Sequence, residues 1–281
     1  MTATLPIDPG RFDRGPFDPE TAEGSLRPRR RRAWLVVGLV IAFVTIALGA
    51  WDLVGLMSHK AVHHERTWSA PVRTLDLDVG DGSVTVVGTN QTGAVVHADG
   101  ARGLYSPTDE QSLVDGTLRI RSSCPFAASW CSLSYRVELP AGAKVVVHSS
   151  DGRVTANGLT GDINLSSSNG RVTANSPSGT LTAHSSNGRV QVTGARSAHV
   201  TATSNNGSVQ VGFAEAPHAV FAHSYNGSVT VGVPRSDISY RVEAHSNNGR
   251  VSTPVRTDPT GSRTITAVSN NGDVTVRYGP A

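Results

Sequence analysis

The chain has 281 residues, among them 29 glycines, and only 5% of its residues are aromatic. Its 25 basic and 22 acidic side chains leave a net charge of +3, and residues 58–281 alone hold 18 basic and 16 acidic groups. This near-neutral bulk does not favour nucleic acid as a partner, because nucleic-acid-binding proteins carry basic surfaces. The many glycines and few aromatic residues are typical of a β protein rich in turns.

Residues 1–32 are rich in proline, glycine and charge. Proline lacks a backbone N–H and its ring clashes with the preceding helical turn, so five prolines rule out one continuous helix here. They are Pro6, Pro9, Pro16, Pro19 and Pro28. We predict a disordered cytoplasmic tail whose last residues are basic, from Arg29 to Arg32.

Residues 33–57 are predicted to form a transmembrane helix. No residue from Ala33 to Ala50 is charged, and a helix of that length spans about 27 Å, close to the bilayer core. Trp34 and Trp51 bracket the run as aromatic belts do, and the arginines before it fit the cytoplasmic side. We expect a single-pass cell-membrane protein, with the lipid bilayer as a partner and the C-terminal domain extracytoplasmic. A cleaved signal peptide is the alternative, but the length of the apolar run favours an anchor.

Residues 58–71 are predicted to form a juxtamembrane linker. The helix is expected to continue outward to about residue 67, before Ser69-Ala70-Pro71 ends it. His59, His63 and His64 have a helical spacing that could hold zinc. A solvated linker is the simpler interpretation, so we predict no metal site and no cofactor.

Residues 72–281 are predicted to form an extracytoplasmic β-repeat domain. Apolar residues alternate with aspartates from Leu75 to Val79, which is the pattern of a half-buried strand. The part up to residue 145 is irregular. Two of its segments, Asp81-Gly82-Ser83-Val84 and Asp115-Gly116-Thr117-Leu118, match part of a motif that recurs later in the chain.

Two cysteines, Cys124 and Cys131, lie in this irregular part. A cysteine pair outside the cytoplasm is expected to be oxidised. We predict a disulfide that closes a small loop and contributes about 2–3 kcal/mol by the loop-entropy model. A metal site would need further ligands, and a redox pair would need a Cys-x-x-Cys spacing.

The second half of the chain repeats one motif seven times: Ser, any residue, Asn or Asp, Gly, any residue, Val. The glycines of the seven copies are Gly152, Gly170, Gly188, Gly207, Gly227, Gly249 and Gly272, so successive copies are 18, 18, 19, 20, 22 and 23 residues apart. A short, nearly fixed period predicts stacked structural units. Alternating apolar residues on both sides of each Gly predict two short strands per copy, and the Asn-Gly between them is expected to supply positive φ.

Two all-β architectures fit this pattern. A meander of hairpins is possible, because Asn-Gly between strands is a strong hairpin signal. A β-solenoid, in which Asn-Gly forms a corner and equivalent strands stack, is the other. We favour the solenoid because the motif serine lies on the apolar side in every copy. A tight corner explains a small residue there, and its hydroxyl could bond to a neighbouring coil.

The copies also carry a family resemblance. Ser167 to Thr173 reads Ser-Ser-Asn-Gly-Arg-Val-Thr, and Leu139 to Val145 reads Leu-Pro-Ala-Gly-Ala-Lys-Val. These segments resemble the bacterial "putative adhesin" family, a domain of unknown function with repeated short β-strands behind a membrane anchor. The resemblance covers about residues 72–279. It implies the fold and suggests adhesion, and it implies no binding residues.

Outward positions of the repeat hold the candidate binding residues. One residue after the Gly, three consecutive copies carry Arg153, Arg171 and Arg189, which could grip an anionic polymer, although a solvated surface is the simpler interpretation. Thr155, Thr173 and Gln191, three residues after the Gly, could equally face a glycan or solvent. Four residues before the Gly, histidines recur at four of the seven copies, and a solenoid would make His223 and His245 neighbours.

The pattern does not favour an enzyme. Carboxylates such as Asp151, Asp162 and Glu215 are scattered, and no hydrolase or phosphate-binding motif is present. We predict a membrane-anchored envelope scaffold that binds a glycan, an anionic polymer or another envelope protein. An envelope-stress or signalling accessory is the alternative, and deletion of residues 1–26 would disable signalling while sparing adhesion. The last coil, ending near Tyr278, is expected to leave an open sheet edge.

Overall fold

The computed structural model describes residues 28–57, 60–102, 106–124 and 131–280. The chain forms two compact units, one ending at Leu53 and the other beginning at Val54. Of the predicted cytoplasmic tail, residues 1–32, the first 27 lie outside the described residues, so their disorder stays a prediction, whereas residues 28–32 are helical.

Most of the helix α1 (Pro28–Met57) belongs to the first unit. It begins five residues before the expected start at residue 33, because proline is tolerated in the first turn of a helix, where its missing N–H would have no partner. Side chains of this helix are described from Trp34 to Ala50, and large apolar ones such as Leu39 and Phe43 are exposed. In the described part of the chain, no helix combines the length and apolar character needed to cross a membrane.

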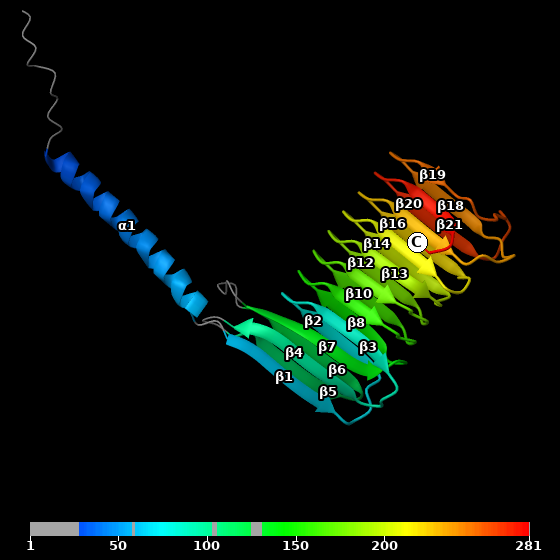
Figure 1. Ribbon diagram of the computed structural model, residues 1–281, viewed down its shortest axis with the longest axis horizontal. Helices are drawn as coiled ribbons and strands as arrows, with labels where there is room; N and C mark the ends of the chain where they lie inside the picture. The colour runs from blue at the N-terminus through cyan, green and yellow to red at the C-terminus, as the bar shows by residue number, and fades with distance from the viewer. Residues whose placement is uncertain (1–27, 58–59, 103–105, 125–130, 281) are drawn as a thin grey trace, which may run out of the picture. The chain divides into compact units, whose positions relative to one another are not determined.

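The second unit contains two sheets that enclose one hydrophobic core (Figure 1). The first, called sheet A, runs in the order β1 (Lys60–Trp68), β4 (Ala94–Arg102), β7 (Ser132–Pro140), β3 (Val84–Thr89), β9 (Val154–Asn157), β11 (Val172–Asn175), β13 (Val190–Ala195), β15 (Val209–Phe213), β17 (Val229–Val233), β21 (Val274–Tyr278) and β19 (Val251–Ser252). The second, called sheet B, runs in the order β18 (Arg241–Ser246), β20 (Thr264–Ser269), β16 (Ala219–Ser224), β14 (His199–Ser204), β12 (Leu181–Ser185), β10 (Ile163–Ser167), β8 (Lys144–Ser149), β2 (Thr74–Val79), β6 (Thr117–Ser123) and β5 (Thr108–Val114).

Each motif copy supplies one strand to each sheet, with the Asn-Gly corner between them. Equivalent strands of neighbouring copies pair in parallel and without offset, as Ile163 with Leu181 and Val172 with Val190. A hairpin meander would pair consecutive strands antiparallel. The parallel register therefore contradicts the meander and agrees with the predicted stacking of coils.

The alternating apolar residues face the core as predicted. In β10 the buried residues are Ile163, Leu165 and Ser167, while Asn164 is exposed. The motif valines Val154, Val172, Val190, Val209, Val229 and Val274 are all 0% exposed. Burial of one valine side chain contributes about 1.5–3 kcal/mol, so this column is a large part of the domain's stability.

The last coil does not lie at the end of the stack. Strand β20 pairs with β16 on one side and β18 on the other, and β21 likewise lies between β17 and β19. The seventh copy is thus inserted between the fifth and the sixth. The expected open edge near Tyr278 was wrong, and so was the contact between His223 and His245, because Val268 lies between them in the register.

The sixth coil therefore forms the open end, and its inward residues are partly uncovered. Val251 is 45% exposed, whereas its counterparts in the inner coils are fully buried. We expect Val229→Ala to lower the free energy of unfolding by about 2–3 kcal/mol and Val251→Ala by less than about 1 kcal/mol. Urea denaturation of both variants measures this, and a larger loss at Val251 would contradict the inserted order.

The first part of the domain departs from the repeat. Lys60–Trp68, expected within a linker that continues the helix, forms strand β1, which pairs antiparallel with β4. The helical continuation was wrong because cross-strand pairs such as His63 with Asp99 and Glu65 with His97 favour the sheet. The β domain therefore begins before residue 72.

The two early motif fragments behave differently. Asp81-Gly82-Ser83-Val84 joins β2 to β3 as a true coil, since β3 pairs in parallel with β9. Asp115-Gly116 instead closes the antiparallel hairpin of β5 and β6, with positive φ of 50° and 76° at its two residues. Two positive φ values in a two-residue loop are what a type I′ hairpin turn requires, so this fragment is not a copy of the corner.

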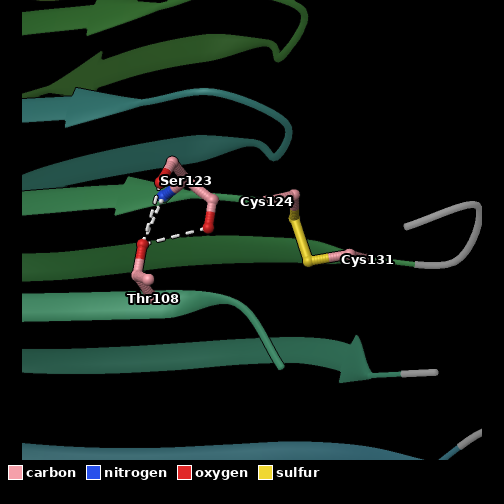
Figure 2. The surroundings of a disulfide bond; sticks show 4 residues. All are labelled: Thr108, Ser123, Cys124 and Cys131. Carbon is pink, nitrogen blue, oxygen red and sulfur yellow. Dashed lines mark hydrogen bonds between the residues drawn. A yellow bond between two sulfur atoms is a disulfide. The ribbon is translucent and has the colours of Figure 1, made fainter. Parts of the chain in front are cut away.

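The predicted disulfide is confirmed. Cys124 and Cys131 are bonded, with their Cα atoms 5.8 Å apart (Figure 2). The bond follows directly on β6, where Thr108 of β5 and Ser123 of β6 are joined through their hydroxyls at 2.9 Å. It therefore ties the end of β6 to the start of β7, two strands that belong to different sheets.

Candidate functional site

Six of the seven motif serines form a buried column at the corner between the sheets, and Ser246 at the open end is half-buried. In the third copy the Ser185 Oγ accepts a hydrogen bond from the Gly188 N–H at 2.8 Å and donates one to the Gly170 carbonyl oxygen at 2.8 Å. The same kind of bond to a carbonyl oxygen of the neighbouring coil is donated by Ser167, Ser204, Ser224 and Ser269. The predicted bond from the serine hydroxyl to a neighbouring coil is present, so this column is structural.

The motif glycines are needed for a different reason than expected. Among the glycines with positive φ, none belongs to the seven copies. A Cβ on Gly170 would instead overlap the carbonyl oxygen of Gly152, and one on Gly188 would overlap that of Gly170. Each glycine is thus required because the backbones of stacked corners touch.

The motif asparagines form a ladder of side-chain amides along the outside of the corner. Each donates its Nδ2–H₂ to the Oδ1 of the preceding rung at 2.5–2.9 Å. In stack order the rungs are Asp151, Asn169, Asn187, Asn206, Asn226, Asn271 and Asn248. The ladder thus ends on the Asp151 carboxylate, which accepts without donating.

A second carboxylate, Asp81, lies beyond Asp151. Burial and the neighbouring negative charge of Asp151 raise the pKa of Asp81 above 3.8. Because the folded pKa lies above the unfolded value, the ionised Asp81 destabilises the folded state at neutral pH. This penalty disappears as the pH falls through the raised pKa.

Asp81→Asn removes the repulsion and supplies an amide that can donate to Asp151. We expect a gain in the free energy of unfolding of a few tenths of a kcal/mol at pH 7, small because the site is exposed and screened. Chemical denaturation at pH 7 and at about pH 3 measures it. An equal gain at both pH values would contradict the charge explanation.

The three predicted arginines lie in one column on the outer face of sheet A. Backbone hydrogen bonds of 2.9 Å and 3.0 Å, from Val154 N–H to the Arg171 oxygen and from Val172 N–H to the Arg189 oxygen, hold their positions in register. All three side chains are exposed. Neighbouring strands lie about 4.8 Å apart, so the column places three positive charges at the repeat of the stack.

No acidic side chain of the described residues forms an ion pair with Arg153, Arg171 or Arg189. The next coil offers a hydroxyl instead, since Arg189 Nε donates to Ser208 Oγ at 3.0 Å. The sixth copy's Arg250 has the same motif position, but three coils separate it from Arg189 and it lies beside Asp273 at 3.9 Å. The three consecutive arginines are therefore an uncompensated cationic stripe.

Two uncharged columns run beside the arginines on the same face. Alternate residues of a strand point to the same side, so Thr173 and Asn175 follow Arg171 outward along β11. The nearer column is Thr155, Thr173, Gln191, Gln210 and Thr230, and the farther one is Asn157, Asn175, Thr193, Gly212 and Gly232. In the farther column Asn175 donates to Asn157 at 2.8 Å. The face thus combines positive charge with amides and hydroxyls.

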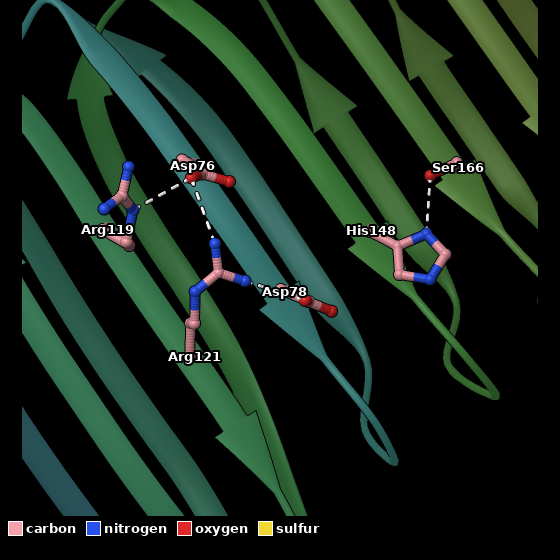
Figure 3. Close-up of polar contacts among 6 residues, drawn as sticks. All are labelled: Asp76, Asp78, Arg119, Arg121, His148 and Ser166. Carbon is pink, nitrogen blue, oxygen red and sulfur yellow. Dashed lines mark hydrogen bonds and ion pairs between the residues drawn. The ribbon is translucent and has the colours of Figure 1, made fainter.

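The outer face of sheet B is partly self-neutralised (Figure 3). Arg119 donates to Asp76 at 3.1 Å, and Arg121 donates to Asp78 at 2.9 Å. The neighbouring His148 bonds to Ser166 at 2.9 Å. These arginines are already occupied by carboxylates, unlike the stripe on sheet A.

The predicted histidine positions do not assemble into a metal site in the described residues. His148 and His184 each bond instead to a hydroxyl of the next coil, Ser166 and Thr203, both at 2.9 Å. His63 and His64 are consecutive in β1 and so point to opposite faces. The Asp99 carboxylate raises the pKa of His63 above 6.5. His59 lies outside the described residues.

A family model of the Toastrack DUF4097 domain matches residues 69–277 of this chain. The chain belongs to the Toastrack DUF4097 family. This confirms the resemblance seen in the motif copies, and the matched range contains both sheets except for β1 and the last residue of β21. No match is found among curated proteins.

Solved structures similar to this family member are described as adhesins. A putative cell adhesion protein from Clostridium sporogenes is 11% identical, with 78% of this chain and 100% of that chain covered and a TM-score of 0.36. A putative adhesin from Bacteroides fragilis is 14% identical, with 78% and 97% covered and a TM-score of 0.41. At these identities and TM-scores, the similarity does not indicate what this chain binds.

Sequence reasoning missed the asparagine ladder and the ion pairs of sheet B. The ladder was detectable, because Asn or Asp occupies the same motif position in all seven copies and parallel register brings such residues together. The pairing of Arg119 with Asp76 could not be detected in this way. It depends on β6 pairing with β2 on one side, while the Asp115-Gly116 turn joins β6 to β5 on the other.

Proposed function

We propose that this Toastrack protein is a membrane-anchored scaffold of the cell envelope that binds an anionic polymer along the arginine stripe of sheet A, formed by Arg153, Arg171 and Arg189. It acts by binding and not by catalysis. The observation that supports this most is that no acidic side chain in the described part of the chain pairs with the stripe, whereas Arg119 and Arg121 of sheet B are paired with aspartates.

Three like charges at successive strands repel one another, and like charges at neighbouring sheet positions are destabilising. A polyanion lying along the stack relieves this repulsion and gains charge-assisted hydrogen bonds from planar guanidinium groups. A polymer with regularly spaced acidic groups matches the regularly spaced arginines of the stripe better than a single small anion does.

The anchor is the second part of the proposal. The uncharged run of residues 33–50 supports it, and so does the basic run before it, which suits a cytoplasmic flank. The large side chains of α1, such as Trp34 and Phe43, are 74% and 73% exposed, which is unfavourable in water and favourable in lipid. With the N-terminus in the cytoplasm, the β domain that carries the stripe lies outside the cytoplasm.

We expect replacement of Arg153, Arg171 and Arg189 by serine in the full chain to weaken retention on isolated acidic envelope polymers by about tenfold or more at low salt. Retention of the unaltered protein should also fall as salt rises. Cosedimentation over a salt series measures both.

A matched control removes three other arginines, each already beside an acid. Arg196, Arg241 and Arg256 lie 3.3 Å, 4.0 Å and 3.5 Å from carboxylates. Their replacement by serine changes the net charge equally and should leave retention nearly intact. Equal losses in both triple variants would show that overall charge, and not the stripe, controls binding.

A further inference from the structure

The regular outer face of sheet A is interrupted at one place, beside the arginine stripe. The register of β13 against β15 shifts between Val192 and Ala195. Thr193 and Gly194 of β13 thus lie opposite Gly212 alone, which is a β-bulge. Bulges occur often next to functional sites, where they redirect side chains.

A cavity of about 450 Å³ lies over this bulge. Its floor includes Gly212, which has no side chain at an outward position, and Phe213. Gln191, Gln210 and Thr193 line it with polar groups, and the Gly279-Pro280 segment after β21 closes one side. The cavity therefore results from three local departures from the repeat: the bulge, the missing side chain and the C-terminal segment.

The lining suits a ring with apolar faces and a polar rim. Its surface is mostly apolar, and none of the described residues that line it is charged. Among the described residues, no hydrogen bond engages the side chains of Gln191, Gln210 or Thr193, which leaves two amides and one hydroxyl free for a ligand. A pyranose ring has this distribution of C–H faces and hydroxyl edges.

The cavity continues the arginine stripe. Arg189 directly precedes β13 and lies two residues before Gln191, about 7 Å away along the extended chain. A ligand whose ring fills the cavity can therefore place an adjacent acidic substituent on the guanidinium of Arg189. One extended molecule can use both features.

We propose that this cavity is a subsite for one pyranose ring of an acidic glycan, whose carboxylate or phosphate groups lie on Arg153, Arg171 and Arg189. This rests on the proposed function and adds to it the sugar chemistry of the polymer. The cavity recognises the ring and the stripe recognises the charge.

The test compares two polyanions on the full chain in detergent micelles. Oligogalacturonate offers pyranose rings with carboxylates, and polyglutamate of similar charge offers carboxylates without rings. The pair Gln191→Ala and Gln210→Ala removes the cavity amides. The control pair Asn164→Ala and Thr182→Ala changes two exposed residues on the outer face of sheet B, away from the cavity and the stripe. All of these positions are on the surface, and thermal unfolding checks that each variant is folded.

We expect the double glutamine variant to bind oligogalacturonate about tenfold more weakly by calorimetry, with polyglutamate binding and the control unchanged. Replacement of the three arginines should weaken both polyanions. An unchanged oligogalacturonate affinity in the glutamine variant would overturn the sugar subsite while leaving the stripe intact. An equal loss of polyglutamate affinity in the glutamine variant would show that the cavity binds a polypeptide, and it would overturn the sugar subsite as well. If the unaltered protein binds neither polymer, the proposed function fails together with this one.

Discussion

Gly170→Ala should destabilise the β domain by at least about 3 kcal/mol. The added Cβ would overlap the carbonyl oxygen of Gly152, so the clash is with backbone and not with a side chain that can rotate away. Relief requires the coils of the second and first copies to separate, which would weaken the Ser167 bond to Gly152 at 3.0 Å. Urea denaturation followed by circular dichroism measures the loss.

Gly142→Ala is the matched control for this substitution. It lies in the turn between β7 and β8, and the nearest atom to its added Cβ would be the Thr160 Oγ1 at 3.9 Å. Its free energy of unfolding should change by less than about 0.5 kcal/mol, or rise slightly because alanine restricts the unfolded chain. If the two variants unfold at the same urea concentration, the close contact between stacked corners is not what requires glycine.

Ser185→Ala should cost about 2–4 kcal/mol. Its hydroxyl is fully buried and joins the Gly188 N–H to the Gly170 carbonyl oxygen, both at 2.8 Å. Alanine fills almost the same volume, so the loss comes from leaving a buried donor and a buried acceptor without partners, at about 1–3 kcal/mol each. Equilibrium denaturation in urea measures this cost.

Two other serines provide the comparison. Ser186 follows directly in the chain, is half-buried, and its side chain forms no hydrogen bond among the described residues, so Ser186→Ala should be nearly neutral. Ser246, in the open sixth coil, donates to the Gly272 oxygen at 2.8 Å but is only half-buried. Ser246→Ala should therefore cost less than Ser185→Ala, because water can replace the lost bond. The reverse order would contradict the assigned roles.

Local alternation predicted the strands of the repeat, because burial of every second residue is a property of each short segment. The motif serine also pointed correctly to bonding between coils. The reason for the glycine was wrong, because turn chemistry considers only neighbours in the chain. The contact that excludes a side chain at Gly170 comes from Gly152, 18 residues away.

The insertion of the seventh copy could not have been predicted from these residues. The fifth, sixth and seventh copies offer the same serine, asparagine and valine to their neighbours, so either β20 or β18 could pair with β16. The one indication in the sequence is the longer spacing between the last copies, 22 and 23 residues, which shows that the segments connecting their coils are longer. Strand β1 was missed because its polar residues, such as His63 and Glu65, resemble a solvated linker until β4 is placed beside it.

For the candidate site, the sequence placed the three arginines at equivalent positions, and parallel register then made them neighbours. Their lack of acidic partners depends on which coils are adjacent. Arg250 has the same motif position, yet it pairs with Asp273 because the seventh coil lies beside the sixth. The cavity over Gly212 was not predictable, since it depends on a register shift between β13 and β15.

The claim that the stripe on sheet A is the binding site is tested most directly by the Nε–H resonances of the arginines, in ¹H–¹⁵N spectra of the full chain titrated with oligogalacturonate. Binding at the stripe predicts saturable shifts at Arg153, Arg171 and Arg189, and none at Arg119 or Arg121, which are held by aspartates on sheet B. Shifts confined to other arginines, or equal shifts at all of them, would contradict it.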